Sequence, residues 1–410
     1  MVHDYAGHPF QVQLSRELAR RGHEVLHLHF GGCQTPKGAL VKRADDPPSF
    51  AVESIGLDRP FVKYSFVRRL SQERELGRIL AERITAFASD VVISANAPLD
   101  VQAGVFRAAR SAGAAFIFWL QDIQSEAIAR HLRRRLPGLG RLIALRFIAL
   151  ERRLLRMADR VVVITDDFRP FLERWDVEPE RVITVENWAP LDDIVPRPKD
   201  NQWAREHSLN DRRVILYSGT IGLKHNPALL LEVAKLLQIE QPGARLVVVS
   251  EGLGADWLRE RGRDLATLVQ LPFQPFDALA DVIGTAEVVV AILEPDAGVF
   301  SVPSKVLTYL AAGRPVIGAI PAENLGARLI AGNGAGVVVS PHDPRALAAA
   351  CIDLLAREDD RREMGRRARA YAEAAFDIGR IADRFEGLLD TVVTSRHPRR
   401  QAAGQLAQGG

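Results

Sequence analysis

Short apolar segments that alternate with helical segments constrain the fold of this chain more than any other feature. In the first half, five segments read as strands, at 24–30, 91–95, 116–120, 161–165 and 181–185. A second series follows residue 213, at 214–217, 245–250, 269–271, 288–292, 316–319 and 336–339. Buried strands that alternate with helices are typical of parallel sheets covered on both faces. We therefore predict an α/β protein with two Rossmann-like, doubly wound parallel sheets.

A proline-bearing run separates the two series of strands. Pro190, Pro196 and Pro198 lie in this run, which reads as an interdomain linker, and 410 residues suit two domains. We predict an N-terminal domain over 1–190, a linker over 191–203 and a C-terminal domain over 204–375. We expect a helix over 376–394 that packs back toward the N-terminal domain, and a disordered Gln-, Gly- and Ala-rich tail over 395–410.

Two regions of the first half depart from the alternating pattern. The first strand is represented only by the stub Met1 to Asp4 before a loop, so we expect either a start placed too far downstream or an unusually short strand. Residues 35–60 show no period and are expected to be irregular. Helices are expected over 11–21 and 66–87.

The composition excludes several classes of protein. The net charge is only +3, so no overall signature of nucleic-acid binding is present. Cys33 and Cys351 lie far apart and near no Cys or His cluster, which favours a reducing compartment and argues against disulfides or a zinc site. No apolar run reaches the roughly 20 residues that span a bilayer. We expect a cytoplasmic protein without a bound cofactor.

Two lysines point to an anion site in the second half. The chain has only seven lysines, and Lys224 and Lys305 both lie in Gly- or Pro-bearing loops directly after apolar strands. We expect Pro303 at the first position of a helix, with Lys305 in its first turn. A cation is unfavourable there unless it shares an anion with the helix N-terminus, and a diphosphate is the obvious candidate. The alternative is an ordinary capped helix with a solvated lysine.

Four motifs together resemble a known family. They are Gly22-His23-Glu24-Val25, Gly219 to Lys224, Leu271-Pro272-Phe273-Gln274-Pro275 and, above all, Ser301 to Ile317. Over residues 2–390 the chain resembles glycosyltransferase family 4, which has the GT-B fold of two Rossmann-like domains facing a central cleft. The likeness is closest to the branch that builds bacterial surface polysaccharides and O-antigens.

The resemblance implies a set of residues that bind a nucleotide-sugar donor. The backbone of the glycine loop would approach the diphosphate, the loop lysine would neutralise it, Phe273 and Gln274 would contact the nucleobase, and a second segment would complete the diphosphate site. In all, the implied donor-binding residues are Gly219, Thr220, Gly222, Lys224, Phe273, Gln274, Val302, Ser304, Lys305 and Thr308. The alternatives are a tight strand-to-helix turn for the glycines and strand-end packing for Phe273 and Gln274.

The chain departs from the family pattern at two positions of this site. Many members carry two glutamates eight residues apart, and the corresponding positions here are Phe300 and Thr308. The second glutamate normally holds the ribose, and Thr308 can accept only a weaker hydrogen bond. Glu294 or Asp296 is a candidate substitute for the first.

The N-terminal domain would supply further catalytic residues at the ends of its strands. The family often has a histidine after the strand at 116–120, where this chain has Gln121 followed by Asp122. Asp122 is expected to contact a sugar hydroxyl, or alternatively to cap the next helix. His8 is expected to face the cleft, or alternatively to be a surface residue. With Lys224 and Lys305, these are the predicted catalytic residues.

The predicted reaction is transfer with retention of anomeric configuration and without a metal. Lysines and loop amides would stabilise the departing diphosphate. We interpret Asp166-Asp167 and Asp192-Asp193 as a helix start and a linker turn, and a metal-binding motif is the alternative. The donor is expected to be UDP-linked and the acceptor a lipid-linked or polysaccharide chain. A sugar-nucleotide epimerase or hydrolase, or a non-catalytic sugar-nucleotide-binding subunit, remains open.

One basic stretch predicts a membrane partner. Residues 130–160 contain ten arginines and only two acids, Glu151 and Asp159. On a helical wheel at ~100° per residue, five of the arginines fall within an arc of roughly 140°: Arg141, Arg146, Arg152, Arg153 and Arg156. We expect a basic amphipathic hairpin on the inner face of the cytoplasmic membrane. The alternative is a helix packed on the N-terminal domain with a solvated basic face.

Overall fold

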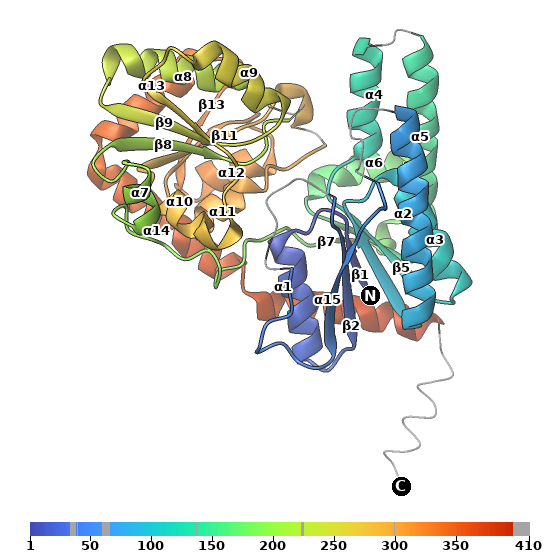
Figure 1. The fold of residues 1–410 in the computed structure, drawn as a ribbon. Helices are drawn as coiled ribbons and strands as arrows, with labels where there is room; N and C mark the ends of the chain where they lie inside the picture. The colour runs from blue at the N-terminus through green and yellow to red at the C-terminus, as the bar shows by residue number, and fades with distance from the viewer. Residues whose placement is uncertain are drawn as a thin grey trace. The chain divides into compact units, whose positions relative to one another are not determined.

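The computed structural model forms two compact units (Figure 1). It describes residues 1–32, 38, 40–59, 66–135, 138–222, 225–298 and 300–396. Unit 1 comprises Met1–Glu186 and the segment from Ile378 onward, and unit 2 comprises Asn187–Asp377. Within the described residues, no helix combines the length and the apolar character needed to cross a membrane.

Unit 1 is built on a seven-stranded sheet in the order β3-β2-β1-β4-β5-β6-β7, with every neighbouring pair parallel. Its strands are β1 (Val2–Asp4), β2 (Val25–Phe30), β3 (Phe50–Ile55), β4 (Val91–Ala95), β5 (Ala115–Leu120), β6 (Arg160–Val163) and β7 (Val182–Thr184). Every residue of β2, β4 and β5 is buried, as expected for strands covered on both faces. The prediction of a Rossmann-like parallel sheet is confirmed.

Strand β3 corrects the expectation that residues 35–60 are irregular. It pairs in parallel with β2, from Val25 opposite Phe50 to Phe30 opposite Ile55. Only Phe50 and Ile55 at its two ends are buried. Because β3 is an edge strand with a partly exposed middle, its sequence lacks the continuous apolar run by which the central strands are recognised.

Helices cover the sheet of unit 1. They are α1 (Pro9–Arg20), α2 (Phe66–Phe87), α3 (Leu99–Ser111), α4 (Gln124–Arg135), α5 (Leu139–Met157), α6 (Arg169–Arg174) and α15 (Ile378–Arg396). Helix α15 extends past residue 395, where a disordered tail was expected to begin, and residues 397–410 lie outside the described part. Figure 1 shows α4 and α5 side by side as a hairpin that extends beyond the sheet.

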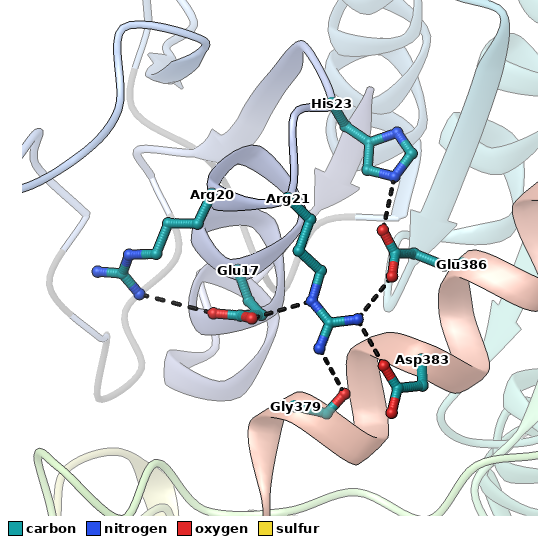
Figure 2. Close-up of polar contacts among 7 residues, drawn as sticks. All are labelled: Glu17, Arg20, Arg21, His23, Gly379, Asp383 and Glu386. Carbon is teal, nitrogen blue, oxygen red and sulfur yellow. Dashed lines mark hydrogen bonds and ion pairs between the residues drawn. The ribbon is translucent and has the colours of Figure 1, made fainter.

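An ion-pair cluster ties α15 to the start of the chain (Figure 2). The guanidinium of Arg21, which follows α1, donates to Asp383 and to Glu386 at 2.6 Å each and to the Gly379 carbonyl at 2.8 Å. The ring Nε2 of His23 lies 3.0 Å from Glu386. The hydrogen bonds that Arg21 donates to carboxylates raise its pKa, and the bond to Asp383 has the largest effect. The cluster therefore fixes a helix that is more than 350 residues away in sequence from its partners.

Unit 2 is built on a six-stranded parallel sheet in the order β10-β9-β8-β11-β12-β13. Its strands are β8 (Arg213–Ser218), β9 (Ala244–Val249), β10 (Leu268–Leu271), β11 (Val288–Ile292), β12 (Val316–Ala319) and β13 (Gly336–Val339). The helices are α7 (Gln202–Glu206), α8 (Pro227–Glu240), α9 (Leu253–Gly262), α10 (Leu279–Gly284), α11 (Lys305–Ala311), α12 (Leu325–Gly332), α13 (Pro344–Ala356) and α14 (Glu358–Ala375).

The strand order of each sheet indicates where a ligand belongs. The order reverses between β1 and β4 in unit 1 and between β8 and β11 in unit 2. In open parallel sheets, ligands bind outside the carboxyl ends of the strands at such a switch point. Both candidate sites described below lie at these positions.

Candidate functional site

Two buried tyrosines shape the loop that follows β8. The hydroxyl of Tyr217 donates to the carbonyl of Thr220 at 2.9 Å, and the hydroxyl of Tyr309 accepts from the amide of Ser218 at 2.9 Å. Gly219 has φ +132°, a backbone conformation that side chains strongly disfavour. The loop that was predicted to approach a diphosphate is therefore held in a glycine-dependent conformation.

Lys305 extends from α11 to this glycine loop. Its Nζ lies 2.6 Å from the hydroxyl of Tyr217 and 4.2 Å from the centre of that ring. A Cβ placed on Gly219 would lie only 3.1 Å from Cε of Lys305. The structure therefore brings together Gly219 and Lys305, two predicted site residues that are far apart in sequence, at the switch point of unit 2.

The ammonium group of Lys305 is held in an unusual environment. Burial lowers its pKa from 10.5 to about 7. No carboxylate of the described residues forms an ion pair with it, and its hydrogen-bond partner, the Tyr217 hydroxyl, is neutral because burial raises the pKa of that phenol. An anion beside Lys305 would favour its charged form, so this position suits a phosphate group.

The segment before α11 is braced by a buried asparagine. Nδ2 of Asn324 donates to the carbonyls of Gly298 and Ser301 at 2.8 Å each. Helix α11 begins at Lys305, so Pro303 precedes the helix rather than opening it, and that prediction was wrong. The reason is that Ser304, although helical in its dihedral angles, is the residue that caps the helix.

The remaining predicted donor residues in this part of the chain differ in exposure. Ser304 is exposed, whereas Val302 and Thr308 are partly buried. Lys224 lies outside the described residues, so the predicted convergence of two lysines on one diphosphate is not tested. The described loop ends at Gly222, whose amide donates to Nδ1 of His225 at 3.1 Å, and Nε2 of His225 lies 3.5 Å from Nζ of Lys305.

The predicted nucleobase residues follow β10, two strands away from β8. The amide of Phe273 donates to Oε1 of Glu251 at 3.1 Å, and Oε1 of Gln274 accepts from the indole N–H of Trp203 at 2.9 Å. Both predicted residues are therefore fixed by partners that the sequence did not reveal. Glu251 comes directly after β9 and Ser250, so its place at the end of a strand was the signal that could have identified it.

A second cluster lies at the carboxyl ends of β1, β4 and β5 in unit 1. Asp4 ends β1 and accepts from both the amide and Nδ1 of His8, the latter at 3.2 Å. Asn96, which follows β4 with φ +58°, places Nδ2 3.3 Å from Nε2 of His8. His8 is one-quarter exposed, whereas Asp4 is fully buried. A buried carboxylate therefore orients the partly exposed ring of His8.

The negative charge of Asp4 and the positive charge of His8 stabilise each other. Burial favours the neutral forms, but the mutual attraction and hydrogen bonding of the pair outweigh it, so the pKa of His8 is raised and that of Asp4 is lowered. The charge of Asp122 also raises the pKa of His8. The structure therefore places Asp122 within electrostatic reach of His8. Gln121, its neighbour, is 8% exposed.

Glu151 accepts the hydrogen bonds from the first amides of α4 that Asp122 would accept if it capped this helix. Its Oε1 and Oε2 accept from the amides of Gln124 and Ser125, which open α4, at 3.0 and 2.9 Å. Burial raises the pKa of Glu151 to about 7. Because a buried acid from α5 serves the first amides of α4, Asp122 is not required as the cap of this helix.

Within the described residues, no group of three or more His, Cys, Asp or Glu side chains is arranged to hold a metal ion. Oδ1 of Asp166 accepts from Arg169 at 2.8 Å and from Thr184 at 2.5 Å, and Asp167 lies in the same 3₁₀ turn. Asp192 and Asp193 lie in a turn after residue 190.

Comparisons with known proteins assign a domain type to each half of the chain. A family model described as "Glycosyl transferase 4-like domain" matches residues 8–188. A model described as "Glycosyl transferases group 1" matches residues 212–357. The two matches do not overlap, and one covers most of unit 1 while the other lies within unit 2.

Individual relatives show similar proteins at moderate identity. The D-inositol 3-phosphate glycosyltransferase of Thermobispora bispora is 31% identical over 222 residues, 50% of each chain, so this chain spans about half the length of that relative. The putative colanic acid biosynthesis glycosyl transferase WcaI of Escherichia coli is 26% identical over 302 residues, 72% of each chain. HepE of Anabaena, solved in complex with UDP-glucose, shares the fold with a TM-score of 0.69 at 15% identity, covering 95% of this chain and 98% of its own.

Proposed function

Because the chain is a GT-B glycosyltransferase, with a glycosyl transferase 4-like domain followed by a glycosyl transferases group 1 domain, we propose that it transfers a sugar from a UDP-linked donor. The proposed acceptor is a lipid-linked or polysaccharide chain of the cell surface. The observation that carries the donor half of this proposal is the contact of Lys305 with the glycine loop after β8. The complex of HepE with UDP-glucose supports the choice of base.

Lys305 would stabilise the departing diphosphate in this reaction. Among the described residues, the groups close to its charge are uncharged or titratable rather than anionic: the ring and hydroxyl of Tyr217, and Nε2 of His225 at 3.5 Å. A diphosphate would restore its positive form, and charge that develops on the leaving group would strengthen the interaction. Lys224 is proposed to contribute from the same loop and Thr308 to contact the ribose. This arrangement requires no metal, as proposed for a retaining transfer assisted by the leaving group.

The cluster in unit 1 would bind sugar hydroxyls. His8 is held by Asp4 and can present Nε2, while Asp122 supplies a carboxylate near it. Charged acceptors and donors of this kind form strong hydrogen bonds with hydroxyl groups. We propose that His8 and Asp122 position the acceptor or the transferred sugar, with Gln121 beside them.

Helix α5 supports a membrane-bound acceptor. Among the described residues, seven large hydrophobic side chains are exposed, and four of them belong to α5. Leu139, Leu142 and Leu145 are 61%, 67% and 53% exposed, and Met157 is 39% exposed. Leucines on the surface of a helix with basic neighbours suit the interface of an anionic membrane.

The arginines of α5 contribute less to membrane binding than their number indicates, because three of them form ion pairs within the protein. Arg146 pairs with Asp100 at 2.5 Å, and Arg152 and Arg156 both pair with Asp176. Arg141 and Arg153 form no ion pair with the described residues. We therefore propose that the leucines, rather than the arginines alone, hold the protein on the inner face of the cytoplasmic membrane.

A turnover assay tests the proposed transfer. The purified protein is incubated with UDP-sugars, with and without membrane extract, and release of UDP is measured. Release that requires the extract is expected, and the anomeric configuration of the product, read by NMR, should match that of the donor. Release without an acceptor would indicate hydrolase or epimerase chemistry, and no release with any donor would indicate a non-catalytic subunit.

A vesicle assay tests the membrane proposal separately. Sedimentation with vesicles of phosphatidylglycerol and phosphatidylcholine is compared for the wild type and the Leu142→Ser/Leu145→Ser variant. The double variant should bind at least tenfold more weakly, whereas Ile239→Ser, which alters a 78% exposed side chain on α8, should bind like the wild type. Equal binding of all three proteins would contradict the role of α5.

A further inference from the structure

Unit 2 contains a cavity of about 770 Å³ at the edge of the sheet opposite the glycine loop. Glu287 and Pro315, which line it, directly precede β11 and β12, so the cavity lies at the amino ends of these strands. The candidate donor site lies at the carboxyl ends of the same sheet. The cavity is therefore a separate feature that the proposed reaction does not use.

The charged residues that line the cavity are mostly cations. Its basic residues are Lys199, Arg314, Arg361, Arg362, Arg366 and Arg369, and its carboxylates are Glu287, Glu358 and Glu373. The pairs Lys199–Glu287, Arg362–Glu358 and Arg369–Glu373 account for the three carboxylates. The cations of the lining therefore exceed its carboxylates two to one.

Among the described residues, Arg314 and Arg361 of the lining donate only to neutral groups. Nη2 of Arg314 donates to the carbonyls of Arg197 and Gly284 at 2.5 Å each, and Nε of Arg314 is buried without a hydrogen-bond partner in the described structure. Nη1 of Arg361 donates to the carbonyls of Leu354 and Leu355 at 2.6 Å each.

The charges of Arg314 and Arg361 are therefore not neutralised by an ion pair within the described residues. Burial lowers the pKa of Arg314, and the attraction of Glu287, which raises it, only partly offsets that effect.

Small residues form part of the lining of the cavity. A Cβ on Gly365 of α14 would lie 2.4 Å from the carbonyl oxygen of Gly313, so α14 approaches the turn after α11 through two glycines. Ala312 and Ala370 also line the cavity. With short side chains along its floor and arginines around it, the cavity leaves room for a ligand beside the guanidinium groups.

We propose that this cavity binds a small phosphorylated anion, through Arg314 and Arg361 with Arg362, Arg366 and Arg369 around them. Guanidinium groups bind phosphate oxygens in bidentate geometry, and the volume falls within the range of ligand sites, roughly 300–1,000 Å³. Helix α11 begins at Lys305 and ends at Ala311, whose carbonyl accepts from Arg369 at 2.7 Å. The anion site and the donor site therefore share one short helix.

Titration of the full chain with inorganic pyrophosphate tests the proposal. The Lys305→Met variant is used as background, so that binding at the donor site is weakened, and heat is recorded by calorimetry. We expect binding of one pyrophosphate per chain, weakened at least tenfold by Arg361→Gln and by the charge reversal Arg366→Glu. Arg345→Gln, an exposed position on α13 outside the lining, should bind as tightly as the background protein.

Two results would overturn the proposal. One is the absence of pyrophosphate binding in the Lys305→Met protein at millimolar concentration. The other is equal affinity in the Arg361→Gln, Arg366→Glu and Arg345→Gln variants. Because Arg366 is exposed, its variant remains informative if Arg361→Gln loosens the end of α13, and the thermal unfolding of each variant is measured alongside.

Discussion

The ammonium nitrogen of Lys305 lies 2.6 Å from the hydroxyl of Tyr217 and over the face of the same ring, at 4.2 Å from its centre. One neutral aromatic residue thus provides both a hydrogen-bond acceptor and a cation–π contact for a lysine with a lowered pKa. Tyr217 also donates to Thr220 in the glycine loop. The contact therefore couples the position of the lysine to the conformation of the loop that would hold a diphosphate.

Replacement of Lys305 by methionine should weaken UDP binding without lowering the stability of the protein. Loss of a charged hydrogen bond to the diphosphate, about 1.5–3 kcal/mol, should weaken UDP binding roughly 10- to 100-fold. The melting temperature should stay the same or rise, because a buried ammonium group is removed. Calorimetry with UDP and thermal unfolding measure the two effects. Lys235→Met, at a half-exposed site on α8, is the control, and equal UDP affinity in both variants would exclude Lys305 from the site.

UDP binding should weaken as the pH rises above 7. In the free protein the pKa of Lys305 is about 7, and a bound diphosphate raises it. Below pH 7 the lysine is already charged. Above pH 7 binding must take up a proton, so affinity falls by at most about tenfold per pH unit until the pKa of the complex is reached.

Calorimetry from pH 6.5 to 9, in buffers that differ in ionisation enthalpy, measures this proton uptake. Lys305→Arg keeps its charge throughout this range and should flatten the profile. The same slope in the arginine variant would assign the proton to another group.

Gly219→Ala should distort the glycine loop. At φ +132° a side chain costs about 1–3 kcal/mol, and the new Cβ would lie 3.1 Å from Cε of Lys305. We expect a lower free energy of unfolding and at least tenfold weaker UDP binding. Gly243→Ala, where a Cβ meets no atom within 4 Å, is the matched control. A variant at Gly219 with unchanged stability and affinity would show that the loop tolerates another conformation.

Glu151→Gln should change how stability depends on pH. The pKa of Glu151 is about 7 in the folded protein against an ordinary 4.5, so the folded state binds more protons between these values. Stability therefore falls as the pH rises from about 4.5 to 7, by on the order of 3 kcal/mol.

Glutamine removes this slope but keeps only one acceptor oxygen for the two amides that open α4, a loss of about 1 kcal/mol. The variant should be less stable than the wild type at pH 5 and more stable at pH 8, as measured by urea denaturation. Parallel curves for the two proteins would show that Glu151 does not titrate in this range.

Arg21→Ala should loosen α15. Arg21 is partly buried and contacts two carboxylates and a carbonyl of this helix, so its loss should destabilise unit 1 by about 1–2 kcal/mol. Hydrogen exchange of the α15 amides should become faster. Arg20→Ala, which removes a more exposed and longer ion pair with Asp45, should leave the exchange of α15 unchanged.

Parts of this structure that depend on local pattern could be predicted from the sequence. The strands Val91–Ala95, Val288–Ile292 and Val316–Ala319 have the predicted bounds, because each is an apolar or nearly apolar run. The proximity of Gly219 and Lys305 also follows from local information, since residues after neighbouring parallel strands meet at one edge of the sheet.

Contacts between distant residues could not be predicted in this way. The hydrogen bond of Trp203 with Gln274 and the capping of α4 by Glu151 join residues 71 and about 26 positions apart. Neither pair has a sequence signature, because a carboxylate or an indole N–H can form a hydrogen bond with many different groups. The edge strand β3 was missed for the opposite reason, since its middle is too polar to read as buried.

The return of α15 to unit 1 has a consequence for biosynthesis. Phe385 of α15 packs against Trp119 of β5, with ring centres 4.9 Å apart and both side chains buried. Unit 2 is continuous from Asn187 to Asp377, so all of it is translated before α15. A chain truncated after residue 377 should therefore still fold its second half, whereas its first half would lack the helix that packs against Trp119.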